Sequence, residues 1–124
     1  MAEKILVTIP TMRLEESISF YVSVLQFKLD NRYDHPGGVV LVFLSKDGFT
    51  IELVANPHMP IGEVGTGAPH ITFTVQSFTE ITSRCEEHRI QLPTPLNLPG
   101  GVSILRFKDP NGVEISFVVG GKVG

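Results

Sequence analysis

Apolar and polar side chains alternate along several short segments of the chain. In KILVTIP, Ile5, Val7 and Ile9 fall on one face, and in HITFTV the same period of two recurs at Ile71 and Phe73. This alternation predicts β-strands with one face in the core and the other facing outwards.

Two other segments carry helical spacing. The segment RLEESISFYVSVL has Leu14, Ile18, Tyr21 and Leu25 at intervals of three or four residues, which places them on one side of a helix. The segment SFTEITSRCEEH begins with Ser77 and a glutamate three residues later, the pattern of a capping box at a helix start. We therefore expect one helix after the first strand of each half of the chain.

The elements follow the same order in both halves. The turn sequences HPGG and KDG separate the strand candidates FKLDNRY, VVLVFLS and FTIELVA in the first half. In the second half, a short strand near Ile90 precedes VSILRF, and DPNG turns the chain into VEISFVV. Each half reads βαβββ, and a period of about half the chain indicates two copies of one unit. We predict a single domain over residues 1–124, with module 1 at about 1–60 and module 2 at about 67–124.

Two turn glycines give the offset of this repeat. Gly48 and Gly112 each stand before the last strand of their half, 64 residues apart. The same offset relates position 6 to His70 and Glu52 to position 116, and it preserves the strand parity of both pairs. These positions are therefore expected to be equivalent in the two modules.

The strand faces opposite the helices are expected to line a concavity. Arg106 belongs to this cup because its neighbours Leu105 and Phe107 suit the core side better. Strand alternation assigns these residues to the lining: Lys4, Leu6, Thr8, Thr50, Glu52, Val54, His70, Thr72, Thr74, Arg106, Glu114, Ser116 and Val118.

Composition narrows the range of functions. A chain of 124 residues with 42% hydrophobic and 19% charged residues is typical of one soluble domain, and it has no apolar run long enough to span a membrane. The start MAEKILV lacks the apolar core of a signal peptide, which predicts a cytoplasmic protein. The net charge of −3 comes from scattered residues, so nucleic acid is not an expected partner. Cys85 is the single cysteine, which excludes internal disulfides and predicts a buried thiol on a helix rather than a nucleophile.

Four segments together resemble a known family. In order along the chain they are VTIPTMRLEESISFYVSVLQFKL, FTIELVANP, PHITFTV and KDPNGVEISFV. They are similar to the vicinal oxygen chelate superfamily, which includes glyoxalases, extradiol dioxygenases, fosfomycin-resistance enzymes and bleomycin-resistance proteins. The resemblance covers nearly the whole chain. It implies the fold class α+β, with two βαβββ modules forming a curved mixed sheet, and commonly a homodimer.

The resemblance also implies four metal-ligand positions, from the first and last strands of each module. Carried over residue by residue, these are Leu6, Glu52, His70 and Ser116. Leu6 has no lone pair, and the Ser116 hydroxyl is a poor substitute for a carboxylate. Catalytic metal sites usually take about three protein ligands. Glu114 lies about 6.6 to 6.8 Å along the strand from Ser116, too far for a simple replacement. We therefore expect no metal, with a Zn, Ni, Mn or Fe ion held by Glu52 and His70 as the alternative.

Several interpretations of these polar residues stay open. His70 is either hydrogen-bonded to Glu52 or a cup threonine, or it forms an acid and base pair with Glu52. Glu52 and Glu114 are either ligand-binding groups or structural partners of Arg106 or Lys4.

Two loop features also stay open at this point. His35 and His58 lie in predicted loops from which they could turn into the cup. The Pro-rich residues 93–101 form either a lid over the cup or a long hairpin connection.

Three functions compete. The favoured hypothesis is a small-molecule binding protein similar to the bleomycin-resistance branch, which confers antibiotic resistance by sequestering a ligand without chemistry. The alternative is a metal-dependent glyoxalase-like lyase or related enzyme with Glu52 and His70 as catalytic candidates. The third is an interaction protein that uses the fold only as a dimer scaffold.

Overall fold

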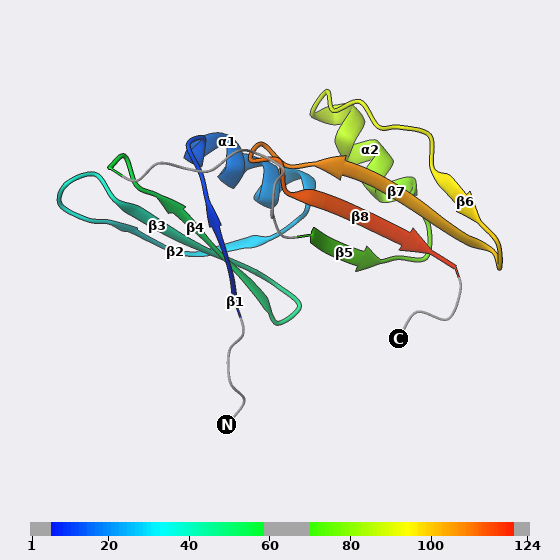
Figure 1. Ribbon diagram of the computed structural model, residues 1–124, viewed down its shortest axis with the longest axis horizontal. Coiled ribbons are helices and arrows are strands. Elements are labelled where there is room, and N and C mark those ends of the chain that lie inside the picture. Colours follow the sequence, from blue (N-terminus) through cyan, green and yellow to red (C-terminus); the bar gives the residue numbers. More distant parts are fainter. Residues whose placement is uncertain (1–5, 59–69, 121–124) are drawn as a thin grey trace. The chain divides into compact units, whose positions relative to one another are not determined.

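The computed structural model describes residues 6–58 and 70–120 (Figure 1). The chain forms two compact units, residues 1–63 and 64–124, which we call module 1 and module 2. Module 1 contains β1 (Leu6–Pro10), α1 (Leu14–Ser19), the π-helical turn η1 (Phe20–Val24), β2 (Lys28–Asp34), β3 (Val40–Lys46) and β4 (Phe49–Ala55). Module 2 contains β5 (His70–Thr74), α2 (Thr79–Glu87), β6 (Leu96–Leu98), β7 (Val102–Lys108) and β8 (Glu114–Val119).

Each module has its own four-stranded mixed sheet. The strand order is β1-β4-β3-β2 in module 1 and β5-β8-β7-β6 in module 2. The first pair in each order is parallel, and the other two pairs are antiparallel. The predicted fold class, α+β with two βαβββ modules, is confirmed.

The register of the parallel pairs confirms the predicted offset. Leu6 pairs with Thr50 in module 1, and His70 pairs with Glu114 in module 2. Both partners in module 2 lie 64 residues after those in module 1. The turn glycines Gly48 and Gly112 even share a φ of 83°, a left-handed conformation that glycine adopts without a Cβ clash.

The core of module 1 lies between the sheet and the helical segment. The strand side chains of Ile51 and Leu53 are completely buried, as predicted from their alternation. The helix differs from the prediction after Ser19, because it continues as a π-helical turn. The wider turn buries both Tyr21 and Leu25, whereas Ile18 is only half-buried.

Module 2 repeats this arrangement with α2. Ile81 and Cys85 on α2 are buried, which confirms the prediction for the cysteine. The capping box at Ser77 is not formed, because the helix begins at Thr79 with Phe78 in the cap position and no side-chain cap bond. Instead, the Ser77 hydroxyl accepts a long hydrogen bond of 3.4 Å from the Thr79 N–H.

The second strand of module 2 lies later in the chain than predicted. Ile90 is not in a strand, and β6 lies within residues 93–101, where we expected only a loop. β6 pairs with β7 across a turn that contains Gly100 and Gly101, both with positive φ. Its three residues pair with Val102, Ser103 and Ile104 of β7. Three residues are too few to show an alternation of apolar and polar side chains, so this strand is recognised by its backbone pairing. Residues 93–101 therefore contain an edge strand and its hairpin turn.

No helix in the described part of the chain is long and apolar enough to cross a membrane.

Candidate functional site

Each sheet has one face buried under its helix and one face that carries polar side chains, which we call the open face. In module 1, Ile9, Ile51 and Leu53 point into the core, so the side chains between them point to the open face. These include Thr8 and Glu52, as predicted. The open face is therefore a direct product of strand alternation.

Glu52 is held at the centre of the module 1 open face. It pairs in register with Thr8, whose hydroxyl donates a hydrogen bond of 2.9 Å to the Glu52 carboxylate. Glu52 is half-buried, and Leu6, one position back on the same face of β1, is 42% exposed. The predicted partners of Glu52 were Arg106 or Lys4. Its partner within module 1 is a threonine. Lys4 lies outside the described residues, and a pairing with Arg106 would join the two modules and stays a prediction.

Aromatic side chains extend this face beyond Glu52. Phe43 is the antiparallel partner of Glu52. The Tyr33 ring, 48% exposed, stands edge-on to Phe43 with 6.0 Å between ring centroids. His35 lies beside Tyr33 at 6.5 Å. The open face of module 1 thus joins a carboxylate to an exposed aromatic surface.

The sequence did not reveal this aromatic surface because β2 contains a bulge. Strict alternation would place Leu29, Asn31 and Tyr33 on the same face. The pairing slips between Leu29 and Asn31, so Leu29 pairs with the buried Leu44 while Asn31 pairs with Phe43 on the open face. One extra residue therefore transfers Tyr33 to the side of Glu52.

The open face of module 2 has a different set of groups. His70 Nδ1 lies 3.3 Å from Glu114 Oε2, and Arg106 Nε lies 3.8 Å from Glu114 Oε1. Glu114 is 29% exposed, whereas the His70 and Arg106 side chains are more than half exposed. Arg106, one of the two cations expected beside Glu114, thus lies next to it. The parallel register places His70 opposite Glu114 within module 2. The expected pairing of His70 with Glu52 would join the two modules and stays a prediction.

Ser116 contributes little surface to this face. It pairs in register with Thr72 on one side and Arg106 on the other, and it is only 7% exposed. A serine hydroxyl is a weak ligand for a divalent cation even when it is accessible. The position that the family resemblance assigns to a carboxylate is thus filled by a small, buried side chain.

The described residues of neither module form a catalytic metal site by themselves. Module 2 brings together His70 and Glu114, one ligand fewer than such sites usually take from the protein. In module 1, Glu52 has a threonine and a phenylalanine as its strand partners. Within residues 6–58 and 70–120, no group of three or more His, Cys, Asp or Glu side chains is placed to hold a metal ion.

The structure also places the two candidates His58 and Cys85. The His58 ring donates through Nε2 to the Gly37 carbonyl at 2.9 Å, which ties it to the β2–β3 loop. Burial raises the pKa of the Cys85 thiol to about 11, with Arg84 opposing the shift, so this thiol is a poor nucleophile near neutral pH. The expected convergence of positions 6, 52, 70 and 116 would bring together residues of both modules. It stays a prediction.

Comparison with known proteins identifies a family and a set of similar folds. The model of the Glyoxalase/Bleomycin resistance protein/Dioxygenase superfamily matches residues 5–117. No curated protein matches the chain at a significant level.

Three solved structures illustrate the range of similar folds. A glyoxylase/bleomycin resistance protein/dioxygenase domain from Frankia sp. EAN1pec is 20% identical with a TM-score of 0.77, over 98% of this chain and 99% of that one. TnmS3, an antibiotic binding protein from Streptomyces sp. CB03234, is 20% identical with a TM-score of 0.69, over 98% of both chains. A glyoxalase I mutant from Zea mays is 19% identical with a TM-score of 0.79, over 97% of this chain and 46% of that one.

Proposed function

Because the chain belongs to the Glyoxalase/Bleomycin resistance protein/Dioxygenase superfamily, we propose that it is a small-molecule binding protein of the bleomycin-resistance kind. It holds its ligand on the open faces without a complete metal site. The proposed ligand-binding residues are Leu6, Thr8, Thr50, Glu52, His70, Thr72, Arg106, Glu114 and Ser116.

The side chains at two implied ligand positions carry this proposal. Leu6 is apolar, and Ser116 is a serine that is only 7% exposed. Glu52 and His70 remain, and each already has a polar partner within its module. A divalent cation would therefore lack the ligand set that catalysis requires.

The open faces suit a cationic ligand with aromatic groups. In module 1 the Glu52 carboxylate lies next to Phe43 and the exposed Tyr33 ring. A carboxylate attracts a cation, and an aromatic ring adds stacking and cation–π contacts. In module 2, the contacts of Glu114 with His70 and Arg106 lie at the solvent-exposed surface and are therefore weak. A ligand is able to replace them. TnmS3, which has a similar fold, is an antibiotic binding protein, and this supports a ligand of antibiotic size.

A thermal-shift screen of chelator-treated protein tests the proposal. Cationic glycopeptides and aromatic cations form the panel, and a ligand at a hundred times its dissociation constant adds about 2.7 kcal/mol of stability. Replacing Glu52→Gln is expected to remove most of the shift, because the carboxylate that attracts the cation is lost. Glu16→Gln is the matched control, since Glu16 is an exposed carboxylate on α1 of the same module. Failure of every compound to raise the melting temperature would count against the proposal.

A metal-dependent glyoxalase-like enzyme is the second candidate. It is favoured by the retained Glu52 and His70 and by the approach of Glu114 to His70. Elemental analysis of untagged protein, together with a glyoxalase assay in added nickel, zinc or manganese, separates the two functions. A stoichiometric metal with metal-dependent turnover would replace the binding proposal by this one.

A further inference from the structure

Module 2 contains a cavity on the helix side of its sheet, away from the open face. Its volume is about 510 Å³, within the range of small-molecule sites. Leu105 lines it and is 2% exposed, whereas the adjacent Arg106 points to the open face. The cavity and the cluster of His70, Glu114 and Arg106 therefore lie on opposite faces of one sheet.

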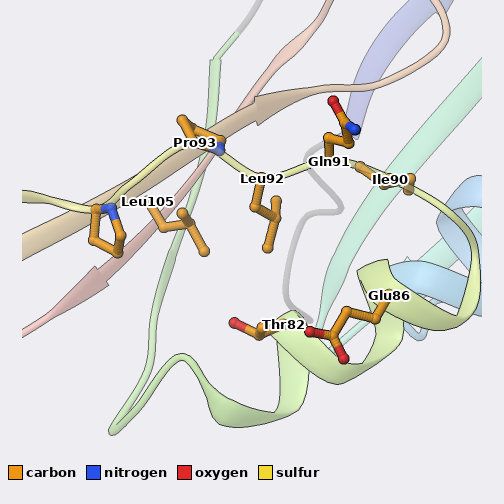
Figure 2. Close-up of a pocket in the computed structure, with 8 residues that line it drawn as sticks. Thr82, Glu86, Ile90, Gln91, Leu92, Pro93 and Leu105 are labelled. Atoms are coloured by element: carbon orange, nitrogen blue, oxygen red, sulfur yellow. The ribbon is translucent and has the colours of Figure 1, made fainter.

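The walls of this cavity are of two kinds (Figure 2). On one side, the connection from α2 to β6 supplies apolar side chains, among them Leu92 and Pro93. On the other side, α2 supplies Thr82 and Glu86, one helical turn apart. Figure 2 shows the Leu92 side chain directed towards α2 and the Gln91 amide directed away from it. The cavity is thus apolar on the side of the connection and has a hydroxyl and a carboxylate on the α2 side.

Glu86 is an exposed carboxylate without an ion-pair partner in the described part of the chain. None of the ion pairs there includes Glu86, although Glu80 on the same helix pairs with Arg84 at 3.7 Å. Glu86 also lies in the last turn of α2, where the helix dipole leaves partial negative charge on the carbonyl groups. Arg84 is the basic residue of this turn and pairs with Glu80, so Glu86 adds to the negative potential of the helix end. The electrostatics of the cavity therefore select for positive charge.

We propose that this cavity is a second binding site, which accepts a small amphiphilic ammonium ion. The ammonium group lies against Glu86 and Thr82, and the apolar body of the ligand lies against Leu92, Pro93 and Leu105. A neutral apolar molecule would leave the carboxylate without a partner, and an anion would be repelled by it. This site is independent of the function proposed for the open faces.

Titrations of ¹⁵N-labelled full-length protein with three related probes test the site. Phenethylammonium carries the charge, 2-phenylethanol is its neutral counterpart, and phenylacetate is the anion. Phenethylammonium is expected to bind most tightly and to shift the amide signals of Thr82, Glu86 and Leu92. Because it is also an aromatic cation of the kind proposed for the module 1 open face, the titration is repeated with the Glu52→Gln variant, in which these three signals are expected to shift as in the wild type. Shifts confined to the open faces, or no saturable shift with phenethylammonium, would overturn the proposal.

Two glutamine variants then isolate the charge. Glu86→Gln is expected to weaken phenethylammonium binding about threefold to fivefold, to the level of 2-phenylethanol, because the lost pair is partly exposed to solvent. Glu87→Gln is the matched control, since Glu87 is exposed, adjacent on the same helix and not part of the cavity wall. Both variants are expected to keep the wild-type melting temperature without ligand. Equal weakening by both variants, or no weakening by Glu86→Gln, would show that Glu86 does not receive the ammonium group.

Discussion

Asp109 shows how one side chain places a functional strand. It is 6% exposed, and its Oδ1 accepts hydrogen bonds of 2.7 Å from the backbone N–H groups of Asn111 and Val113. These bonds form the turn of the DPNG sequence, after which β8 begins at Glu114. The turn residue recognised in the sequence thus acts by fixing the start of the strand that carries Glu114 and Ser116.

Replacing Asp109→Ala is expected to lower the free energy of unfolding by about 2 to 4 kcal/mol. The loss arises because two backbone N–H groups, one of them in the buried Val113, lose a charged acceptor. Urea unfolding measures the change. Asp30→Ala is the control, because Asp30 is exposed, and it is expected to change stability by less than about 0.5 kcal/mol. Equal losses in the two variants would mean that the turn bonds are not decisive.

Cys85 is expected to react slowly with iodoacetamide in the folded protein. Burial raises its pKa from 9.0 to about 11, so at pH 8 the thiolate fraction falls about a hundredfold. Because the folded pKa is the higher one, the neutral thiol stabilises the fold fully below pH 9.0, and this contribution is lost as the pH rises through 11. Alkylation rates with and without denaturant measure the difference. A native rate close to the denatured rate would contradict the buried placement.

At the scale of elements, alternation predicted most strands and missed the points where the backbone departs from regular geometry. The side-chain alternation of β4 and β5 appeared in the sequence, because one face of each is buried and the other is not. The bulge in β2 and the π-helical turn η1 were not predicted. Each inserts one residue into a regular repeat, and no characteristic residue type marks the insertion in the sequence. The three residues of β6 are too few to show any period.

The hairpin of β6 and β7 depends on a close approach to the end of β8. A Cβ at Gly120 would overlap the carbonyl oxygen of Gly101, and Gly120 has a φ of 80°. Gly120→Ala is expected to cost about 2 kcal/mol or more, from backbone strain and from this overlap together. Gly37→Ala is the matched control, because Gly37 has a φ of 88° and open space around it, so it reports about 1 kcal/mol of strain alone. Equal losses measured by thermal unfolding would contradict the close approach.

At the scale of the whole molecule, the duplication explains both the fold and the candidate site. An offset of 64 residues was evident from two glycines, and the parallel registers of both modules obey it. The polar content of each open face followed from strand parity, and so did the pair of Arg106 and Glu114, but two other pairs within the modules did not. Glu52 contacts Thr8, and His70 contacts Glu114. These contacts depend on side-chain rotamers, which no pattern in a single sequence indicates. Homodimer formation and a cytoplasmic location stay predictions.

We propose that the chain binds its ligand without a resident metal. Equilibrium dialysis of the untagged protein against a cationic aromatic ligand from the thermal-shift panel, followed by elemental analysis of the same sample, tests it most directly. We expect saturable ligand binding at about one molecule per chain, unchanged by a chelator, with Zn, Ni, Mn and Fe far below one atom per chain. A stoichiometric metal, or ligand retention that disappears when the chelator is added, would show that a metal takes part in binding.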